Sequence, residues 1–345
     1  MRKIPVIIDC DPGHDDMMAI VLAYGSKKLD IKAITTVAGN NTIQNTTRNA
    51  LNIVNYIGAN EIPVAMGYQN PMVRSHAEQI EKLAKNRRAM KPQTVTEAVP
   101  EKKITGASVH GKSGMDGFEF PNDNPKTIEP MHSVEMMAKI LRESDEKITI
   151  IPTGPLTNVG FLIRLYPELL SKIERISLMG GTSEFVLTRQ FMEFNTFMDP
   201  EATKIVFESG VPITMFGYDV TYRVLYDQKT IDRLYALGNN TGKMVADLLT
   251  YFRDNHNRSL TRLNLGDRAP IHDACAVAGV IDPSVVTDVR KMHVDIETGG
   301  TYFDGATICD HTGALEALPK NVDVVYDMDT DKFLDMLVEA ASVCL

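Results

Sequence analysis

Short apolar segments alternate with amphipathic ones along the first part of the chain. Residues 6–8 and 31–37 are dense in branched apolar side chains, as buried strands are, whereas residues 17–24 and 46–57 repeat apolar positions at helical spacing. Strands that alternate with helices in this way usually lie parallel in one sheet. The pattern therefore predicts a βαβαβ opening with a parallel sheet.

The same alternation returns in the second half of the chain. It predicts strands over residues 148–152, 175–179, 211–216 and 322–326, and helices over residues 156–165, 200–208 and 331–342. No repeat of fixed period and no Gly/Ser-rich linker divides the sequence. We therefore predict one α/β domain over residues 1–345, with a mostly parallel central sheet flanked by helices.

Two long segments interrupt this alternation. Residues 74–124 contain a polar, basic stretch that precedes VHGKSGMDG, and residues 219–269 are helical in the middle but end in the polar run NRSLTRLNLGDRAP. Long excursions from a compact α/β domain often cover a binding site. Both segments are predicted lids, with disorder of part of the first as the plainer alternative.

Composition narrows the class of protein. The sequence has no apolar stretch near the ~20 residues of a membrane helix, and it runs from its first residues directly into a strand, so we expect neither a membrane span nor a secretion signal. Four widely spaced cysteines without CxxC spacing predict free thiols in a reducing cytoplasm. The 36 basic and 45 acidic residues give a net charge of −9 without a large basic cluster, which favours a small-molecule substrate over nucleic acid.

An acidic motif follows the first predicted strand. The run IIDCDPGHDD places Asp9, Asp11, Asp15 and Asp16 at the carboxyl end of that strand, where open α/β sheets bind ligands. Carboxylates so close together cannot all stay ionised unless a cation or shared protons compensate them. Oxygen ligands without neighbouring Cys or His favour Ca²⁺ or Mg²⁺. Helix-dipole complementation explains Asp15 and Asp16 at most, not the pair on the strand side.

Further polar residues occur where other strands are predicted to end. Asn40 lies in TTVAGNN, Thr153 lies in IPTGPLTN, and Glu193 and Asn195 lie in MEFN. Each alone is compatible with turn or cap chemistry. Together they are predicted to converge on one edge of the sheet.

A histidine and an aspartate open a late apolar helix. In APIHDACAVAG, Asp273 alone would be an ordinary helix cap, and a lone His272 is more often a packed residue than a catalytic one. As neighbours, they can supply a metal ligand and a proton donor.

Taken together, these motifs resemble the inosine-uridine-preferring nucleoside hydrolase family, whose members carry a DxDPGxDD opening. The similarity continues through ITTVAGN, HGKSGM, PTGPLTN, LMGG, EFNTFMDPEA, IHD and VDIETGG. It implies a single Rossmann-like α/β domain, usually a homodimer or homotetramer. It also implies hydrolysis of the N-glycosidic bond of ribonucleosides to ribose and free base.

The resemblance implies roles for the acidic residues. Asp11, Asp16 and Asp273, with the backbone carbonyl of Thr153, match ligands of a Ca²⁺ ion. A water on that ion would lose a proton to Asp11 and attack the anomeric carbon. The oxocarbenium-like transition state would be stabilised by the surrounding carboxylates.

The resemblance also assigns residues to the sugar and the base. The predicted ribose contacts are Asp15, Asn40, Met179, Glu193 and Asn195. His110 and His272 match residues near the base, and His272 is the predicted leaving-group acid, able to protonate or hydrogen-bond the departing base.

Departures from the family pattern bear on specificity. Leu187 stands where relatives carry an asparagine near the 5′-hydroxyl, so Thr188, Arg189 or Gln190 would have to take over that contact, or the preferred substrate differs. The chain contains no tryptophan, which excludes the tryptophan-stacked base of purine-specific relatives and favours nonspecific or pyrimidine-preferring hydrolysis. His256, Tyr222 and Tyr226 are candidate substitutes for the aromatic residues near the base, although each also reads as a surface or packing residue.

Parts of the sequence are also compatible with two other functions. A DxD-type phosphohydrolase would also place two aspartates after its first strand, but here PGHDD adds negative charge where a phosphate would approach, and no P-loop is present. A nucleoside- or sugar-binding protein of weak or no turnover is the other alternative, supported by Leu187 and opposed by Asp11 and His272.

Overall fold

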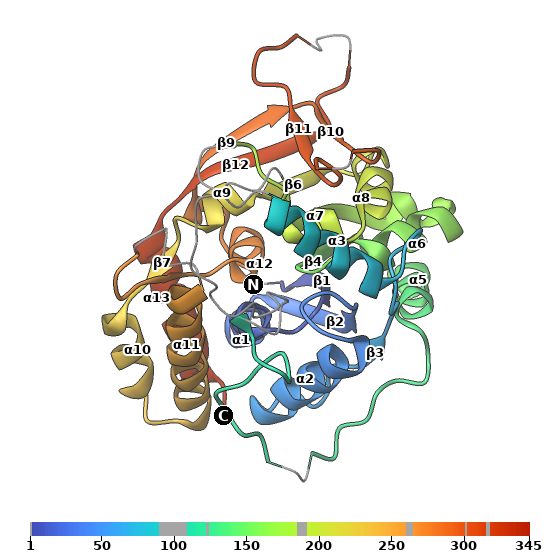
Figure 1. Cartoon of the computed structure of the whole chain (residues 1–345). Helices are drawn as coiled ribbons and strands as arrows, with labels where there is room; N and C mark the ends of the chain where they lie inside the picture. Colours follow the sequence, from blue (N-terminus) through green and yellow to red (C-terminus); the bar gives the residue numbers. More distant parts are fainter. Residues whose placement is uncertain are drawn as a thin grey trace.

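The computed structural model describes residues 2–89, 109–121, 124–184, 192–259, 265–300, 302–314 and 318–345. Its centre is an eight-stranded sheet in which all neighbouring strands pair in parallel except the last two, β12 and β9, which are antiparallel (Figure 1). In spatial order, the strands are β3 (Val64–Met66), β2 (Leu29–Thr36), β1 (Ile4–Cys10), β4 (Ile148–Pro152), β5 (Ile173–Met179), β6 (Ile213–Phe216), β12 (Val322–Met328) and β9 (Val286–Met292).

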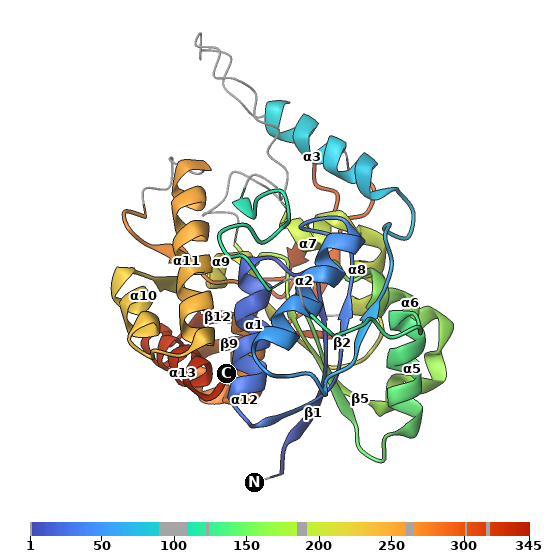
Figure 2. The same cartoon turned by 90° about the horizontal axis from the view of Figure 1, so that it is seen from below.

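Helices cover both faces of the sheet (Figure 2). One apolar core joins the sheet to α1 (His14–Gly25), α2 (Ile43–Tyr56), α12 (Asp273–Ile281) and α13 (Thr330–Val343). A second core joins the other face to α5 (Ser133–Glu143), α6 (Thr157–Leu165) and α8 (Pro200–Phe207). Gly25 at the end of α1 allows close packing on α13, because a Cβ there would lie 2.1 Å from the carbonyl oxygen of Ala340.

The predicted α/β architecture is confirmed, and every strand and helix predicted from the sequence is present. Several elements were not predicted from the sequence, and β9 and α5 are two that belong to the sheet and its flanking layer. Strand β9 forms the exposed edge of the sheet, so most of its side chains are polar or solvent-exposed and the apolar run of a buried strand is lacking. Helix α5 is amphipathic, with Val134, Met137 and Leu141 on its buried side, and it begins at Ser133, after the first long segment has ended.

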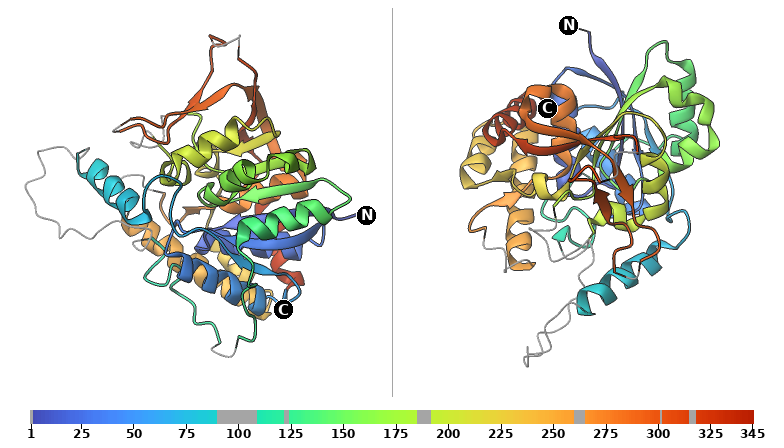
Figure 3. Two further views of the ribbon diagram at one scale, coloured as in Figure 1. Left: turned by 90° about the vertical axis from the view of Figure 1, so that its right-hand side faces the viewer. Right: turned by 90° about the horizontal axis from the view of Figure 1, so that it is seen from above.

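The segment over residues 219–269 is largely part of the domain core. It forms α9 (Tyr218–Thr221), β7 (Leu225–Tyr226), α10 (Gln228–Tyr235), α11 (Asn240–Ser259) and β8 (Ala269–Pro270). Ile231, Leu234, Met244 and Leu248 of α10 and α11 are fully buried in the larger core. Within residues 74–124, α3 (His76–Ala89) lies on the side of the sheet opposite the amino terminus (Figures 2 and 3), whereas residues 90–108 and 122–123 fall outside the described part. The lid function of both segments stays a prediction.

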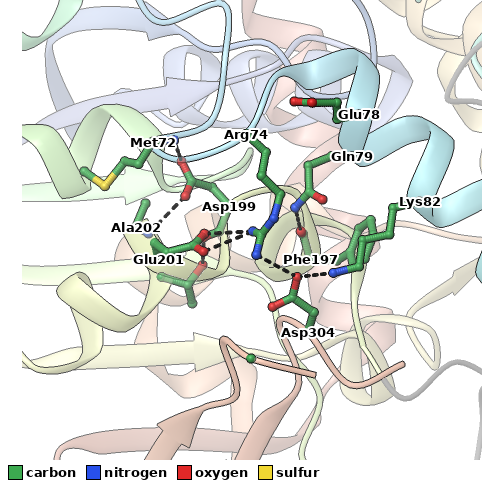
Figure 4. A network of polar contacts seen from close by, with 12 residues as sticks. Met72, Arg74, Glu78, Gln79, Lys82, Phe197, Asp199, Glu201, Ala202 and Asp304 are labelled. Carbon is green, nitrogen blue, oxygen red and sulfur yellow. Dashed lines mark hydrogen bonds and ion pairs between the residues drawn. The ribbon is translucent and has the colours of Figure 1, made fainter. Parts of the chain in front are cut away.

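Ion pairs attach α3 and the residues before it to the domain (Figure 4). Arg74 lies 3.0 Å from a carboxylate oxygen of Glu201 and 3.4 Å from Asp304, while Lys82 lies 2.5 Å from the same oxygen of Asp304. Gln79 donates to the carbonyl of Phe197 at 2.8 Å. Asp304 is fully buried, so these contacts fix α3 against α7 (Phe194–Met198) and the turn at residue 304.

Among the helices in the described ranges, none combines the length and the apolar character that crossing a membrane requires.

Candidate active site

The carboxyl end of β1 and the first turn of α1 bring acidic side chains into the interior. Asp11, Asp15 and Asp16 are all buried, with Asp15 the most exposed at 7%. Asp9 is also buried but faces other partners, since its Oδ1 accepts hydrogen bonds from Thr35 and Asn158 at 2.7 and 2.8 Å. One acid of the motif, Asp9, is therefore hydrogen-bonded within the domain core, and the other three lie together at the edge of the sheet.

Asp273 completes this group from the start of α12. One carboxylate oxygen each from Asp15, Asp16 and Asp273 lie within 4.8 Å of one another, a spacing that could hold a metal ion. Asp11, the fourth acid, is not in this closest triplet, but its charge acts on Asp16 and Asp15. The structure thus brings Asp11, Asp15, Asp16 and Asp273 together and leaves out Asp9, which the motif had also suggested. The division of the four acids into metal ligands and sugar ligands stays a prediction.

Asn40 and Thr153 hold the acids from neighbouring strand ends. The backbone N–H of Asn40 donates to Asp11 Oδ2 at 2.6 Å, and its side-chain amide donates to Asp16 Oδ2 at 3.4 Å. The Thr153 hydroxyl donates to Asp16 Oδ1 at 2.8 Å. Close approach requires glycine at position 39, since a Cβ there would lie 2.1 Å from Asp11 Oδ2.

Burial makes the ionised form of this group costly. Desolvation raises the pKa of Asp15 to about 6 and that of Asp16 to about 7. It also raises the pKa of Asp11 and Asp273 well above the ordinary value, and for Asp11, Asp16 and Asp273 the neighbouring carboxylates add to the effect. Asp11 Oδ1 and Asp15 Oδ1 are buried without a hydrogen-bond partner among the described residues. Converging, unpartnered carboxylate oxygens fit a hard cation such as Ca²⁺.

Asn195 and Glu193 lie beside the acids, at the start of α7. The Asn195 amide donates to the carbonyls of Thr153 and Met179 at 2.8 and 3.1 Å. Glu193 caps α7 by accepting from the backbone N–H groups of Asn195 and Thr196, and burial raises its pKa to about 7. The predicted sugar-side residues therefore share one location with Thr153, and Asn195 and Glu193 also have structural roles there.

A row of aromatic and imidazole rings lies next to the acids, since it ends at His272, the chain neighbour of Asp273. Successive ring centroids lie 5.6 Å apart for His110 and Phe252, 5.9 Å for Phe252 and His256, 6.0 Å for His256 and Tyr222, and 6.3 Å for Tyr222 and His272. Tyr222 Oη and His256 Nε2 are buried without a partner in the described ranges. The row combines flat apolar faces with free polar atoms, as a nucleobase pocket requires.

The imidazoles of this row are neutral at neutral pH. Burial lowers the pKa of His272 to about 3 and that of His110 to about 4. His272 Nδ1 lies 2.7 Å from the Thr221 hydroxyl, which fixes the ring. Burial thus disfavours the protonated form of His272 and favours assistance by a hydrogen bond to the departing base, while its role as leaving-group acid stays a prediction.

Some site residues escaped the sequence analysis and others lie elsewhere. Tyr226 is a packing residue, fully buried with its hydroxyl bonded to the Leu249 carbonyl. His14 and Phe252 were missed, although His14 stands inside the acidic motif and could have been noticed there. Leu187 and the neighbouring candidates Thr188, Arg189 and Gln190 lie outside the described residues.

Comparisons with known proteins agree with this geometry. Residues 6–335 match the model of the family described as inosine-uridine preferring nucleoside hydrolase. The pyrimidine-specific ribonucleoside hydrolase RihA of Escherichia coli O1:K1 is 39% identical over 338 residues, and that of Photobacterium profundum is 38% identical over 335 residues; each alignment covers 97% of both chains.

Solved structures of similar fold come from the same class of enzyme. A purine-preferring ribonucleoside hydrolase from Gardnerella vaginalis superposes with a TM-score of 0.81 at 27% identity, covering 98% of both chains. An inosine-guanosine nucleoside hydrolase superposes with a TM-score of 0.78 at 26% identity, again covering 98% of both chains.

Proposed function

Because this chain belongs to the inosine-uridine preferring nucleoside hydrolase family, whose enzymes hydrolyse ribonucleosides to ribose and free base, we propose that it does so with a bound Ca²⁺ ion and with Asp11 as the base that activates water. The observation that carries this proposal is the buried group of converging acids in which Asp11 Oδ1 and Asp15 Oδ1 have no partner among the described residues.

The proposed ion would be held by Asp11, Asp16, Asp273 and the carbonyl oxygen of Thr153. When bound, it would supply coordination positions for ribose hydroxyls and would lower the pKa of a water molecule. The Thr153 carbonyl accepts one hydrogen bond, from the Asn195 amide, and keeps a second lone pair for a cation.

Asp11 is suited to accept the proton of the attacking water. Its Oδ2 is held by the Asn40 N–H, so the side chain is fixed while Oδ1 stays free. Asp15, beside the proposed ion, would bind the 2′-hydroxyl of ribose, and Asn195, Glu193, Asn40 and Met179 would line the rest of the sugar site. The carboxylates around the sugar favour the positive charge that develops as the glycosidic bond breaks.

The ring row would receive the base. His272, fixed by Thr221, would assist the departing base by hydrogen bonding, and His110 would contact it from the opposite end of the row. We propose a preference for pyrimidine ribonucleosides, because the chain has no tryptophan for stacking a purine and because the RihA proteins of comparable length are named as pyrimidine-specific.

Ribose release tests this function. Uridine, cytidine, inosine and adenosine should be assayed with Ca²⁺ and with a chelator, scoring reducing sugar. We expect uridine and cytidine to be hydrolysed fastest and the chelator to abolish turnover. A binding protein without turnover would instead gain thermal stability from uridine while releasing no ribose, and activity that survives complete metal removal would contradict the metal assignment.

The oligomeric state and the cellular location of the protein are also proposed. We propose a homodimer or homotetramer, as the family resemblance implies, which sedimentation of the purified chain would decide. A cytoplasmic location is supported by the four cysteines, all of which are free thiols in the structure.

A further inference from the structure

Asp219 is a buried acid that the mechanism proposed above does not use. It lies in α9, the short helix after β6, and is 1% exposed. Its Oδ1 accepts a hydrogen bond from the backbone N–H of Ser183 at 3.2 Å, and its Oδ2 accepts one from the Ser183 hydroxyl. Glycine at position 217 leaves room for this side chain, since a Cβ there would lie 2.4 Å from Asp219 Oδ1. Both oxygens of Asp219 therefore bind Ser183, in the segment that follows β5.

Helix α9 and the residue after it hold the ring of His272. The Thr221 hydroxyl lies 2.7 Å from His272 Nδ1. The Tyr218 ring stacks on the imidazole, with centroids 5.0 Å apart and an interplanar angle of 18°, and the Tyr222 ring lies at 6.3 Å. The position of His272 therefore follows the position of α9.

Contacts with other parts of the domain must stabilise α9. The helix has four residues, and a helix of one turn is unstable by itself. Val220 packs in the larger core, and the Tyr218 N–H donates to the carbonyl of Gly181 at 2.8 Å. Asp219 adds its two hydrogen bonds to Ser183. Tyr218 and Asp219 thus join α9 to residues 181–183.

Residues 179–183 are fixed on the sugar side of the proposed site. Met179, a predicted ribose contact, ends β5, and the N–H of Gly181 donates to Oε2 of Glu193, another predicted ribose contact, at 3.1 Å. The carbonyl of Ser183 lies 2.8 Å from Nε2 of His311. Ser183 is therefore a fixed point to which Asp219 can attach α9.

We propose that Asp219 is a positioning residue that joins the sugar side of the site, at residues 179–183, to the base side, at α9. In this way Asp219 sets where His272 lies relative to the bound ribose. Assistance to a leaving group depends on such placement, because the assisting group must reach the base while the sugar stays held. The inference rests on the proposed function, since His272 has a leaving group to assist only if the chain hydrolyses nucleosides.

Two substrates separate positioning from general damage. Asp219→Ala removes both hydrogen bonds to Ser183, so kcat for uridine should fall by about ten- to hundredfold, the scale of a displaced reacting group. A riboside with 4-nitrophenol as leaving group needs no help from His272, so its kcat should match that of the wild type. An equal loss on both substrates overturns the proposal.

Milder variants test the two hydrogen bonds separately. Ser183→Ala keeps the backbone N–H and removes the hydroxyl, so kcat for uridine should fall by about three- to tenfold. Asp219→Asn keeps an acceptor for that N–H, and its amide can donate to the Ser183 hydroxyl oxygen, so it should retain most of the uridine rate. A loss in Asp219→Asn as large as in Asp219→Ala overturns the proposal, with melting temperatures confirming that each variant is folded.

A double variant tests whether Asp219 acts through α9. Once α9 is displaced, removal of the Thr221 hydroxyl has little left to change, so Asp219→Ala/Thr221→Val should lose no more uridine activity than Asp219→Ala alone. Losses that multiply overturn the proposal.

Asp227→Ala is the matched control. Asp227 accepts hydrogen bonds from the N–H and the hydroxyl of one residue, Thr230, at the start of α10. Its removal should lower the melting temperature and leave the ratio of the two substrate rates unchanged, and a shift of that ratio like the shift in Asp219→Ala overturns the proposal. If the wild type releases ribose from neither substrate, the proposed function fails and this inference fails with it. If the wild type is active and Asp219→Ala slows both substrates equally, only the inference fails.

Discussion

Asn40 holds one oxygen of Asp11 and leaves the other free. Its backbone N–H donates to Asp11 Oδ2 at 2.6 Å, whereas Oδ1 is buried without a partner in the described part of the chain. A carboxylate fixed on one side and open on the other can accept a proton without having to reorient.

The first prediction concerns this open oxygen. Asp11→Asn keeps the size of the side chain but removes the proton acceptor, so kcat for uridine should fall by about 10²–10⁴-fold, the usual contribution of a general base. The melting temperature of the metal-free variant should not fall below that of the wild type, because burial already makes ionisation of the Asp11 carboxyl unfavourable. Initial rates and melting curves check both parts, and a variant with wild-type kcat would remove Asp11 from the mechanism.

The second prediction is a pH dependence of stability in the metal-free chain. Asp15 and Asp16 have folded-state pKa values raised to about 6 and about 7 by burial, above the ordinary value of 3.8. A raised folded-state pKa means that their contribution is fully present below about pH 4 and is lost as the pH rises through 6 and 7. The melting temperature of the chelated protein should therefore fall over this range.

Calcium should reverse that trend. A bound cation favours the ionised acids, so the rise in melting temperature on adding Ca²⁺ should be larger near about pH 8 than near about pH 5. Magnesium serves as the comparison ion. A stabilisation by Ca²⁺ that is equal at both pH values would contradict ligation by these carboxylates.

The third prediction concerns the glycine beside Asp11. Gly39→Ala would place a Cβ 2.1 Å from Asp11 Oδ2, so the carboxylate must move and both the calcium-induced rise in melting temperature and the activity should drop sharply. Gly180→Ala is the matched control, because its Cβ would meet neighbours only at 3.5 Å or more. Equal behaviour of the two variants would show that the position of Asp11 is not critical.

The fourth prediction tests the assistance given by His272. Thr221→Val removes the hydroxyl that contacts His272 Nδ1 at 2.7 Å, and kcat for uridine should fall by about three- to tenfold, the range for one hydrogen bond. A riboside with 4-nitrophenol as leaving group needs no hydrogen bond from His272 to depart, so kcat for this substrate should be the same in Thr221→Val and in the wild type. Loss of activity on both substrates would mean that Thr221 acts through folding.

The fifth prediction concerns the attachment of α3. Asp304→Asn removes the buried charge that pairs with Lys82 and Arg74, and the free energy of unfolding should fall by about 1–3 kcal/mol, less than for a fully buried pair because both cations are partly exposed. Hydrogen exchange in residues 76–85 should speed up. Asp335→Asn, which breaks the exposed pair with Arg233, should change stability by less than about 1 kcal/mol.

The positions of the acidic residues and of the strand ends could be predicted from the sequence, because both depend on the local pattern of apolar and polar residues. Asp11, Asp15 and Asp16 follow an apolar strand directly, and a parallel sheet brings strand ends such as those before Asn40 and Thr153 to one edge. The lowered pKa of His272 was beyond reach, because it depends on burial, and the contact of His272 with Thr221 joins residues far apart in the chain. Glu193 also could not be recognised as the cap of α7 from its type alone.

The acids of the cluster come from opposite ends of the polypeptide. Asp11, Asp15 and Asp16 belong to its first sixteen residues, whereas Asp273 enters from α12, after six of the eight sheet strands have passed. An amino-terminal fragment that stops before α12 would contain most of the acidic motif but not the complete cage. During refolding, catalytic competence should therefore return only once the part of the chain that begins at α12 has folded, so that turnover reports completion of the whole domain.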